Sequence, residues 1–138
     1  MTDTVRLLPP VPVVDTDSAG YWQALERGVF AICRCSACRL WMHPPLERCR
    51  RCGAETAFEG VSGRGTVFTY IVVRHPSVPG FVPPYVVALV ELDEQPGLRL
   101  SAIVQADPAK VTIGAPVRAV IREIGRSGFS SPVFELVR

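Results

Sequence analysis

Four of the five cysteines in the chain have the spacing of a metal site. Cys35 and Cys38 form one C-x2-C pair, Cys49 and Cys52 form a second, and residues 39–48 separate the pairs. Each such turn places two thiolates on one side of a tight loop, and two turns complete a tetrahedral site with metal–sulfur distances of about 2.3 Å. Gly53 follows the second pair and allows the positive φ that this turn needs. We therefore expect a structural Zn²⁺ site.

Other interpretations of these cysteines are two disulfides, a thioredoxin-like redox pair, or iron in the same four-sulfur site. The sequence has no charged segment followed by an apolar one at its start, as a secretory signal would have. This favours a cytoplasmic protein, in which thiols stay reduced. No βαβ pattern surrounds the cysteines, which disfavours the redox pair. Iron stays open, because four thiolates bind iron as well as zinc.

Cys33 and His43 lie outside the paired pattern. Cys33 can replace Cys35 only in a less favourable C-x4-C turn, or it is a reactive thiol beside basic residues. We expect it to be an ordinary residue that leads into the metal module. His43 precedes Pro44 and Pro45 between the two pairs, and we expect it to be a bystander and not a metal ligand.

No group of residues has the pattern of a catalytic site. The only histidines are His43 and His75, and neither lies in a hydrolase or metalloprotease motif. Four thiolates leave no open position on the metal for water or substrate. The carboxylates of Glu91, Asp93 and Glu94 fall at a strand end and turn, where solvated acids are common. We therefore expect no autonomous active site.

Residues 15–28 are the best helix candidate. Asp15, Asp17 or Ser18 can cap its first turn, and Gly28 can take the left-handed position at its end. Tyr21, Trp22 and Leu25 share one face. We expect Trp22 to anchor the helix to its own domain, while docking of a partner is the alternative. An extended, proline-rich arm precedes the helix.

From residue 60 onward the sequence has the pattern of short β-strands. We expect strands over 65–74, 85–93, 99–105, 116–124 and 133–137, each rich in β-branched and aromatic residues, and a hairpin turn over 94–97. Five strands in this length suit a small barrel, because closure removes exposed sheet edges. The predicted fold is mainly β: an N-terminal helix, a zinc ribbon and a five-stranded OB-fold barrel. A small sandwich is the alternative.

Two predicted loops of the barrel carry apolar side chains that suit a binding surface. The loop over 75–84 has four prolines together with Val78, Phe81 and Val82, and the loop over 125–132 carries Phe129. These residues either close the ends of the barrel or bind an acyl chain or partner, since rigid apolar groups lower the cost of ordering. Arg64, between Gly63 and Gly65, offers one cation for a phosphate or carboxylate.

Composition narrows the class of protein further. The chain has 138 residues, 48% of them hydrophobic, and a formal net charge of +2. No apolar run approaches the roughly 18 residues of a membrane span. Single-stranded nucleic-acid binding is our alternative function, because five arginines lie in the metal module: Arg34, Arg39, Arg48, Arg50 and Arg51. The small net charge argues against it.

The order of these features resembles the DUF35 family. The features that carry the resemblance are Tyr21-Trp22, both C-x2-C pairs, Pro44-Pro45, the segment 62–66, Pro84-Tyr85 and the segment 90–92. The resemblance covers about Tyr21 to Val137 and implies a rubredoxin-like zinc ribbon followed by an OB-fold. We expect boundaries at 1–29 for the arm and helix, 30–59 for the ribbon and 60–138 for the OB-fold.

The resemblance also implies a function. Members of this family are accessory subunits of thiolase-superfamily enzymes, thiolases or retro-aldolases of the lipid-transfer-protein type, that make or cleave carbon–carbon bonds in acyl-CoA substrates. Some of these systems include a MaoC-like hydratase and degrade steroid side chains. In such assemblies the partner holds the catalytic residues and the DUF35 subunit shapes the CoA and acyl channel. From the family pattern we transfer only the four ribbon cysteines.

Overall fold

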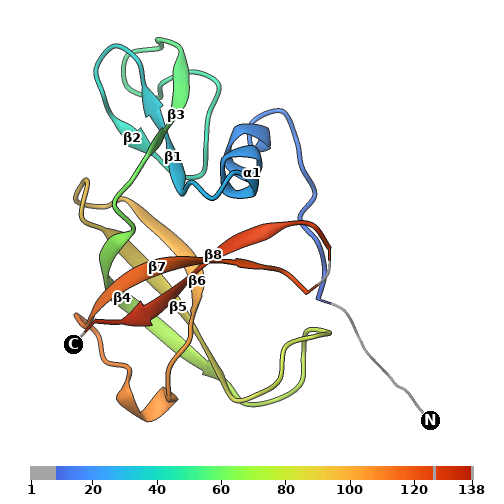
Figure 1. Ribbon diagram of the computed structural model, residues 1–138. Coiled ribbons are helices and arrows are strands. Elements are labelled where there is room, and N and C mark those ends of the chain that lie inside the picture. Colours follow the sequence, from blue (N-terminus) through green and yellow to red (C-terminus); the bar gives the residue numbers. More distant parts are fainter. Residues whose placement is uncertain (1–8, 126, 138) are drawn as a thin grey trace.

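The computed structural model describes residues 9–125 and 127–137. A short helix, α1 (Ala19–Glu26), precedes a sheet made of β1 (Ala31–Cys35), β2 (Trp41–Met42) and β3 (Thr56–Gly60). The rest of the chain forms a barrel. In Figure 1 the small sheet lies at the top, the barrel lies below it, and α1 lies beside the sheet.

Helix α1 is shorter than the predicted segment: its C-terminal glycine signal is as predicted, but no side chain caps its first turn. Ser18 is its N-cap, and the Asp15 carboxylate accepts a hydrogen bond from the Ser18 N–H at 2.8 Å, so the two residues brace the turn before the helix. Gly28 has a φ of +79° just past the last turn, as expected. Tyr21, Ala24 and Leu25 are buried, and this packing supplies most of the stability of so short a helix.

The second unit is a closed barrel with strand order β4-β5-β6-β8-β7. Its strands are β4 (Arg64–Val73), β5 (Tyr85–Leu92), β6 (Arg99–Val104), β7 (Pro116–Glu123) and β8 (Ser130–Leu136). A 3₁₀ turn, η1 (Pro108–Lys110), lies between β6 and β7. All five predicted strands are present, which confirms the mainly β fold and the OB-fold barrel and excludes the sandwich. β8 begins three residues earlier than we predicted, because Ser130 to Pro132 pair with β7.

Buried and half-buried side chains alternate along the strands, and the buried ones form the core of the barrel. On β5, Val86, Ala88, Val90 and Leu92 are buried and point inward, while their neighbours are half-buried on the outer face. The same apolar cluster includes Leu25 of α1 and residues of the ribbon. Helix, ribbon and barrel therefore share one hydrophobic core.

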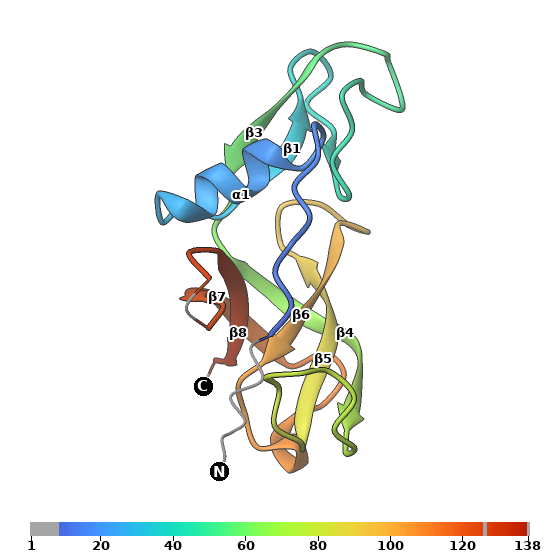
Figure 2. The ribbon, with the colours of Figure 1, turned by 90° about the vertical axis from the view of Figure 1, so that its right-hand side faces the viewer.

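The barrel closes weakly between β6 and β8. These strands are parallel, and Val104 and Phe134 are their one register pair, supported by a 2.7 Å hydrogen bond from the Gln105 N–H to the Phe134 carbonyl. Before this pair the two strands diverge, and the β7–β8 hairpin extends away from the barrel toward α1 (Figure 1). The N-terminal arm runs down from α1 alongside β6 (Figure 2).

Candidate metal centre and ligand surfaces

Two tight turns of the ribbon carry the four paired cysteines. β1 ends at Cys35, and the Cys35 N–H donates to the Leu40 carbonyl at 2.8 Å, which closes the first turn. In the second turn the Cys49 N–H donates to the Ala54 carbonyl at 2.9 Å. Gly53 has the predicted positive φ, +77°. The first turn has Arg39 in the same left-handed region, with a φ of 67°, and the sequence pattern gave no signal of this.

The four sulfur atoms are placed to hold one metal ion. They all lie within 4.8 Å of one another, and the Cys35–Cys52 and Cys38–Cys49 Sγ separations are 3.4 and 3.6 Å. A tetrahedral ion with sulfur bonds of about 2.3 Å requires sulfur separations of about 3.8 Å. The separations of the free thiols therefore fit a tetrahedral thiolate site with only small adjustments.

Backbone N–H groups favour the thiolate form at this site. The N–H groups of Ala37 and Cys38 lie 3.3 Å from the Cys35 Sγ, and they lower the pKa of Cys35 although burial acts in the opposite direction. The N–H of Leu40 and the Arg51 guanidinium lower the pKa of Cys38 to about 6. These donors stabilise the charge that a metal ligand must carry.

Cys33 and His43 do not belong to this cluster. The Cys33 side chain is 2% exposed, and its Sγ lies 3.4 Å from the Leu46 carbonyl. This burial confirms the interpretation as an ordinary structural residue and removes the reactive-thiol alternative. The ring of His43 lies 5.8 Å from that of Tyr21 at the contact with α1, and burial lowers its pKa. It is a bystander to the metal site, as predicted.

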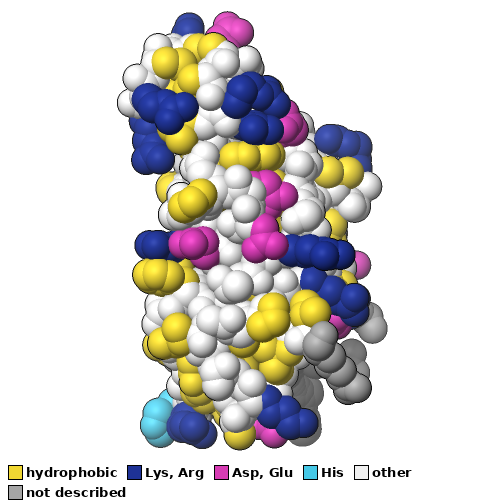
Figure 3. All heavy atoms as spheres, turned by 90° about the vertical axis from the view of Figure 1, so that its left-hand side faces the viewer, with side chains coloured by type: hydrophobic (Ala, Val, Ile, Leu, Met, Phe, Trp, Pro, Cys, Tyr) yellow, Lys and Arg dark blue, Asp and Glu magenta, His cyan; other side chains and the backbone are white. Residues whose placement is uncertain are grey.

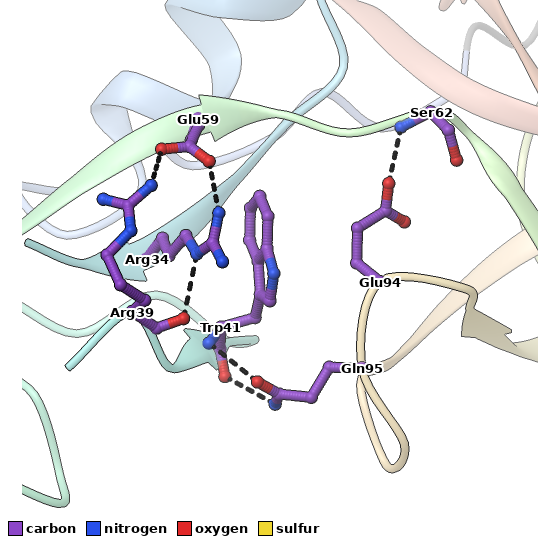
Figure 4. A network of polar contacts seen from close by, with 7 residues as sticks. All are labelled: Arg34, Arg39, Trp41, Glu59, Ser62, Glu94 and Gln95. Carbon is purple, nitrogen blue, oxygen red and sulfur yellow. Dashed lines mark hydrogen bonds and ion pairs between the residues drawn. The ribbon is translucent and has the colours of Figure 1, made fainter.

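The ribbon arginines are used differently from one another. Arg34 and Arg39 both form ion pairs with Glu59, and the Arg34 guanidinium lies 4.3 Å from the centre of the Trp41 ring (Figure 4). Only Arg51 contacts a metal ligand in the described structure, through the Cys38 carbonyl at 3.4 Å. Arg34 and Arg39 share the single carboxylate of Glu59, so these two guanidinium groups are turned toward Glu59 and not toward the thiolates.

The turn between β5 and β6 fastens the ribbon to the barrel. The Gln95 side chain accepts a hydrogen bond from the Trp41 N–H and donates one to the Trp41 carbonyl, both at 3.0 Å. Glu94 accepts a bond from the Ser62 N–H at 2.8 Å (Figure 4). From sequence these residues are only members of a hairpin turn, and nothing in their spacing revealed this contact across 54 positions.

Trp22 and Phe129, which were singled out separately, lie in contact. Their ring centres are 6.2 Å apart in an edge-to-face arrangement, so α1 rests on the tip of the β7–β8 hairpin. Both side chains are half-buried. This supports the interpretation that Trp22 anchors the helix to its own protein, while a role of either residue in partner or ligand binding stays a prediction.

The remaining candidates fall on two separate surfaces. Phe81 packs on Tyr85 at 5.6 Å and is half-buried like Val78, whereas Val82 is 83% exposed. Arg64 begins β4 on another surface, opposite Arg118 of β7. The structure therefore brings Val78, Phe81 and Val82 together in one loop and leaves Arg64 away from them. Their binding roles stay predictions.

The similarity to known proteins follows this two-part structure. Residues 22–59 match the family described as "ChsH2, rubredoxin-like zinc ribbon domain", and residues 59–122 match "ChsH2, C-terminal OB-fold domain". A "DUF35 domain-containing scaffold protein" of Methanocaldococcus jannaschii is 41% identical over 100 residues, which are 69% of either chain. The chain belongs to the DUF35 family.

The relatives differ in length. This chain resembles a chain of the solved structure described as "Ltp2-ChsH2(DUF35) aldolase", with 38% sequence identity and a TM-score of 0.84. The match covers 91% of this chain and 98% of that one. This chain is also 40% identical over 110 residues to the "3-oxo-4,17-pregnadiene-20-carboxyl-CoA hydratase alpha subunit" of Mycobacterium tuberculosis. The chain spans about a third (34%) of that relative, so the similarity concerns one segment of a longer protein.

Proposed function

We propose that this chain is a non-catalytic accessory subunit of a thiolase-superfamily enzyme that acts on acyl-CoA. The observation that carries the proposal is the similarity to the DUF35 chain of the Ltp2-ChsH2 aldolase, which extends over nearly the whole of both chains. A lipid-transfer-protein-type aldolase subunit is therefore the first partner we propose, and a thiolase is the second. A MaoC-like hydratase is a further candidate, because hydratase alpha subunits are among the relatives.

The metal centre supports a structural role. Four thiolates complete the coordination of a tetrahedral ion, so substrate and water find no open position on it. We propose Zn²⁺ as the ion and a cytoplasmic location. Among the described residues, no helix has the length and apolar character needed to cross a membrane. One zinc per chain in a colourless protein would support this assignment, whereas a coloured iron-containing protein would contradict it.

The nucleic-acid alternative receives less support from the geometry. Arg34 and Arg39 are held by Glu59, so two of the five ribbon arginines are not free to meet phosphates. On the face in Figure 3, basic side chains gather over the ribbon, but acidic groups lie among the basic ones farther down. Tight binding of a single-stranded oligo-dT probe with a steep salt dependence would reverse this ranking.

Co-expression with a candidate aldolase of the lipid-transfer-protein type from the same organism tests the proposal. We expect the two proteins to purify together, and carbon–carbon bond cleavage or formation to require both. A candidate partner that is fully active and stable alone would contradict the proposal. In the same assay, Val82→Asp tests whether the β4–β5 loop contacts the partner, and Ile113→Asp is its control.

A further inference from the structure

The four clustered cysteines of the ribbon differ in their exposure to solvent. Cys35 and Cys49 are buried, with 0% and 4% of their surface exposed, and Cys38 is half-buried. Cys52 is the exposed member of the cluster. The ribbon forms one end of the molecule (Figure 1), so the barrel does not lie over it. A reagent in solution therefore reaches the Cys52 sulfur more easily than the other three.

The hydrogen bonds to the four sulfur atoms are also unequal. The buried sulfurs of Cys35 and Cys49 each have two backbone N–H donors, at 3.3–3.5 Å. The Cys38 sulfur has one backbone N–H and one guanidinium group as donors. Among the described residues, the Cys52 sulfur has a single backbone N–H donor, that of Ala54.

Both differences make Cys52 the most nucleophilic of the four sulfurs. A hydrogen bond to a thiolate withdraws charge from the sulfur, and a thiolate stabilised in this way is a weaker nucleophile. Burial adds a second protection, because oxidation of cysteine follows exposure as well as thiolate character. Cys52 has the least of both protections. The structure therefore moves the reactive position from Cys33, which is buried against the Leu46 carbonyl, to Cys52.

A second sulfur lies where it can complete an oxidation of Cys52. The Sγ atoms of Cys35 and Cys52 are 3.4 Å apart. A sulfenic acid condenses with a neighbouring thiol to form a disulfide, and this step needs the two sulfurs close together. Cys35 is shielded from solvent but not from Cys52, so it is the natural partner for this step.

We propose that Cys52 is a modification site for peroxides and that its oxidation dismantles the metal centre. The Cys52 thiolate attacks one oxygen of hydrogen peroxide: a sulfur–oxygen bond forms, the oxygen–oxygen bond breaks and hydroxide leaves. The Cys35 thiolate then attacks the sulfenic sulfur, which forms the disulfide and expels a second hydroxide. The two sulfurs supply the two electrons that reduce the peroxide.

The disulfide removes half of the ligand set. Cys38 and Cys49 remain as thiolates, and two ligands cannot close a tetrahedral site. Because metal binding supplies folding free energy to a module of this size, oxidation loosens the ribbon, and a thiol reductant together with zinc restores it. The inference goes beyond the proposed function and does not depend on it, since it requires no partner.

The test uses the full zinc-loaded chain and a substoichiometric amount of hydrogen peroxide. Zinc release is followed with a chromogenic chelator. The remaining thiols are alkylated after unfolding, and mass spectrometry of the peptides locates the disulfide. We expect the first disulfide to join Cys35 and Cys52, zinc release to keep pace with its formation, and Cys33 to stay reduced.

Cys52→His and Cys38→His are a matched pair of variants. Each leaves a Cys3His ligand set, which also occurs in structural zinc sites, but only Cys52→His removes the reactive sulfur. Under peroxide we expect Cys52→His to release zinc at least about tenfold more slowly than the wild type, and Cys38→His to stay within about threefold of it. If either variant binds zinc too weakly, the disulfide map of the wild type decides the proposal by itself.

Three results would overturn the proposal: a first disulfide between any other pair of cysteines, zinc that stays bound after the disulfide has formed, or equal peroxide sensitivity of the two histidine variants. Each of them would show that the exposed position of Cys52 does not determine where the ribbon is oxidised.

Discussion

At the scale of single residues, five cysteines in a similar setting have two different roles. Four lie with their sulfur atoms within 4.8 Å of one another, while Cys33, only two positions before Cys35, is buried against the Leu46 carbonyl. On β1, Cys33 and Cys35 point to the same side of the strand, so spacing alone does not separate them. The C-x2-C turn separates Cys35 from Cys33, because it brings the second sulfur of each pair close enough to bind the same metal ion.

Cys49→Ala should abolish metal binding and unfold the ribbon. Three thiolates cannot close the tetrahedral site, and metal binding supplies folding free energy, about 10–16 kcal/mol in small zinc modules. Metal content by mass spectrometry and protease sensitivity of residues 30–59 measure the effect. Cys33→Ala is the matched control: it should keep the metal and lose about 1 kcal/mol of stability. Equal metal loss in both variants would contradict the assignment of ligands.

His43 should make the stability of the protein depend on pH. Burial lowers its pKa from the ordinary value of 6.5, so the unfolded chain binds a proton more readily than the folded one. The contribution of His43 to the free energy of unfolding is therefore complete above pH 6.5. It is lost as the pH falls toward the lower pKa of the folded state. Thermal denaturation between pH 7.5 and 5.5 should show this slope in the wild type and a shallower one in His43→Gln.

His75→Gln is the control for this experiment, because His75 is exposed in the β4–β5 loop. We expect it to leave the slope unchanged. An unchanged slope in His43→Gln would show that other groups cause the pH dependence.

At the scale of elements, the turn between β5 and β6 does more than reverse the chain. Its Gln95 amide pairs with the backbone of Trp41 as a neighbouring strand would, and so it extends the β1–β2 sheet toward the barrel. Trp41 also packs into the shared core. The ribbon is therefore held to the barrel by side-chain hydrogen bonds to its backbone as well as by apolar contact.

Gln95→Ala should loosen the ribbon from the barrel. Two net hydrogen bonds are lost, which costs about 1–3 kcal/mol in the free energy of unfolding. Hydrogen exchange at the Trp41 amide should accelerate, since that N–H loses its acceptor. Gln23→Ala on the exposed side of α1 is the control and should change neither quantity. Unaltered exchange at Trp41 in Gln95→Ala would contradict the role of this contact.

At the scale of the whole molecule, one core joins the ribbon to a barrel that buries its own apolar residues. The ribbon has only a small buried cluster around its cysteines, so we expect its stability to depend on both a bound metal and the barrel. Exposed apolar side chains remain on the outer surface, among them Val82 at 83% and Ile113 at 68% exposure. Single exposed apolar residues are common on protein surfaces, but Val82 lies in one loop with the half-buried Val78 and Phe81, so we expect a partner to cover this loop.

Val82→Asp should weaken assembly with the partner and leave the isolated fold intact. The side chain is almost fully exposed, so the unfolding free energy should change by less than about 0.5 kcal/mol, while a charge at an apolar contact disfavours binding. Co-purification and surface plasmon resonance with the thiolase-like partner measure assembly. Ile113→Asp, between η1 and β7, is the control. Equal loss in both variants, or in neither, would contradict an interface at the β4–β5 loop.

The sequence by itself determined the strands, the helix with its C-terminal glycine, and the four clustered cysteines. These features depend on spacing along the chain: side chains alternate along a strand, and a C-x2-C turn positions its sulfurs locally. The family resemblance, which also rests on motif order, added the rubredoxin-like type of the ribbon and the proposed class of partner. Boundaries were less exact, as the early start of β8 shows.

Only the tertiary structure decided which distant residues meet. Gln95 forms hydrogen bonds with the backbone of Trp41, and the rings of Trp22 and Phe129 lie in contact. Glu59 forms ion pairs with Arg34 and Arg39. The cleft of about 490 Å³ between β6 and the β7–β8 hairpin likewise exists because β6 and β8, far apart in sequence, share one register pair and lie apart over the residues that precede it. The physical reason is that such contacts depend on how packed elements are oriented in space, and side-chain type and local spacing leave that orientation undetermined.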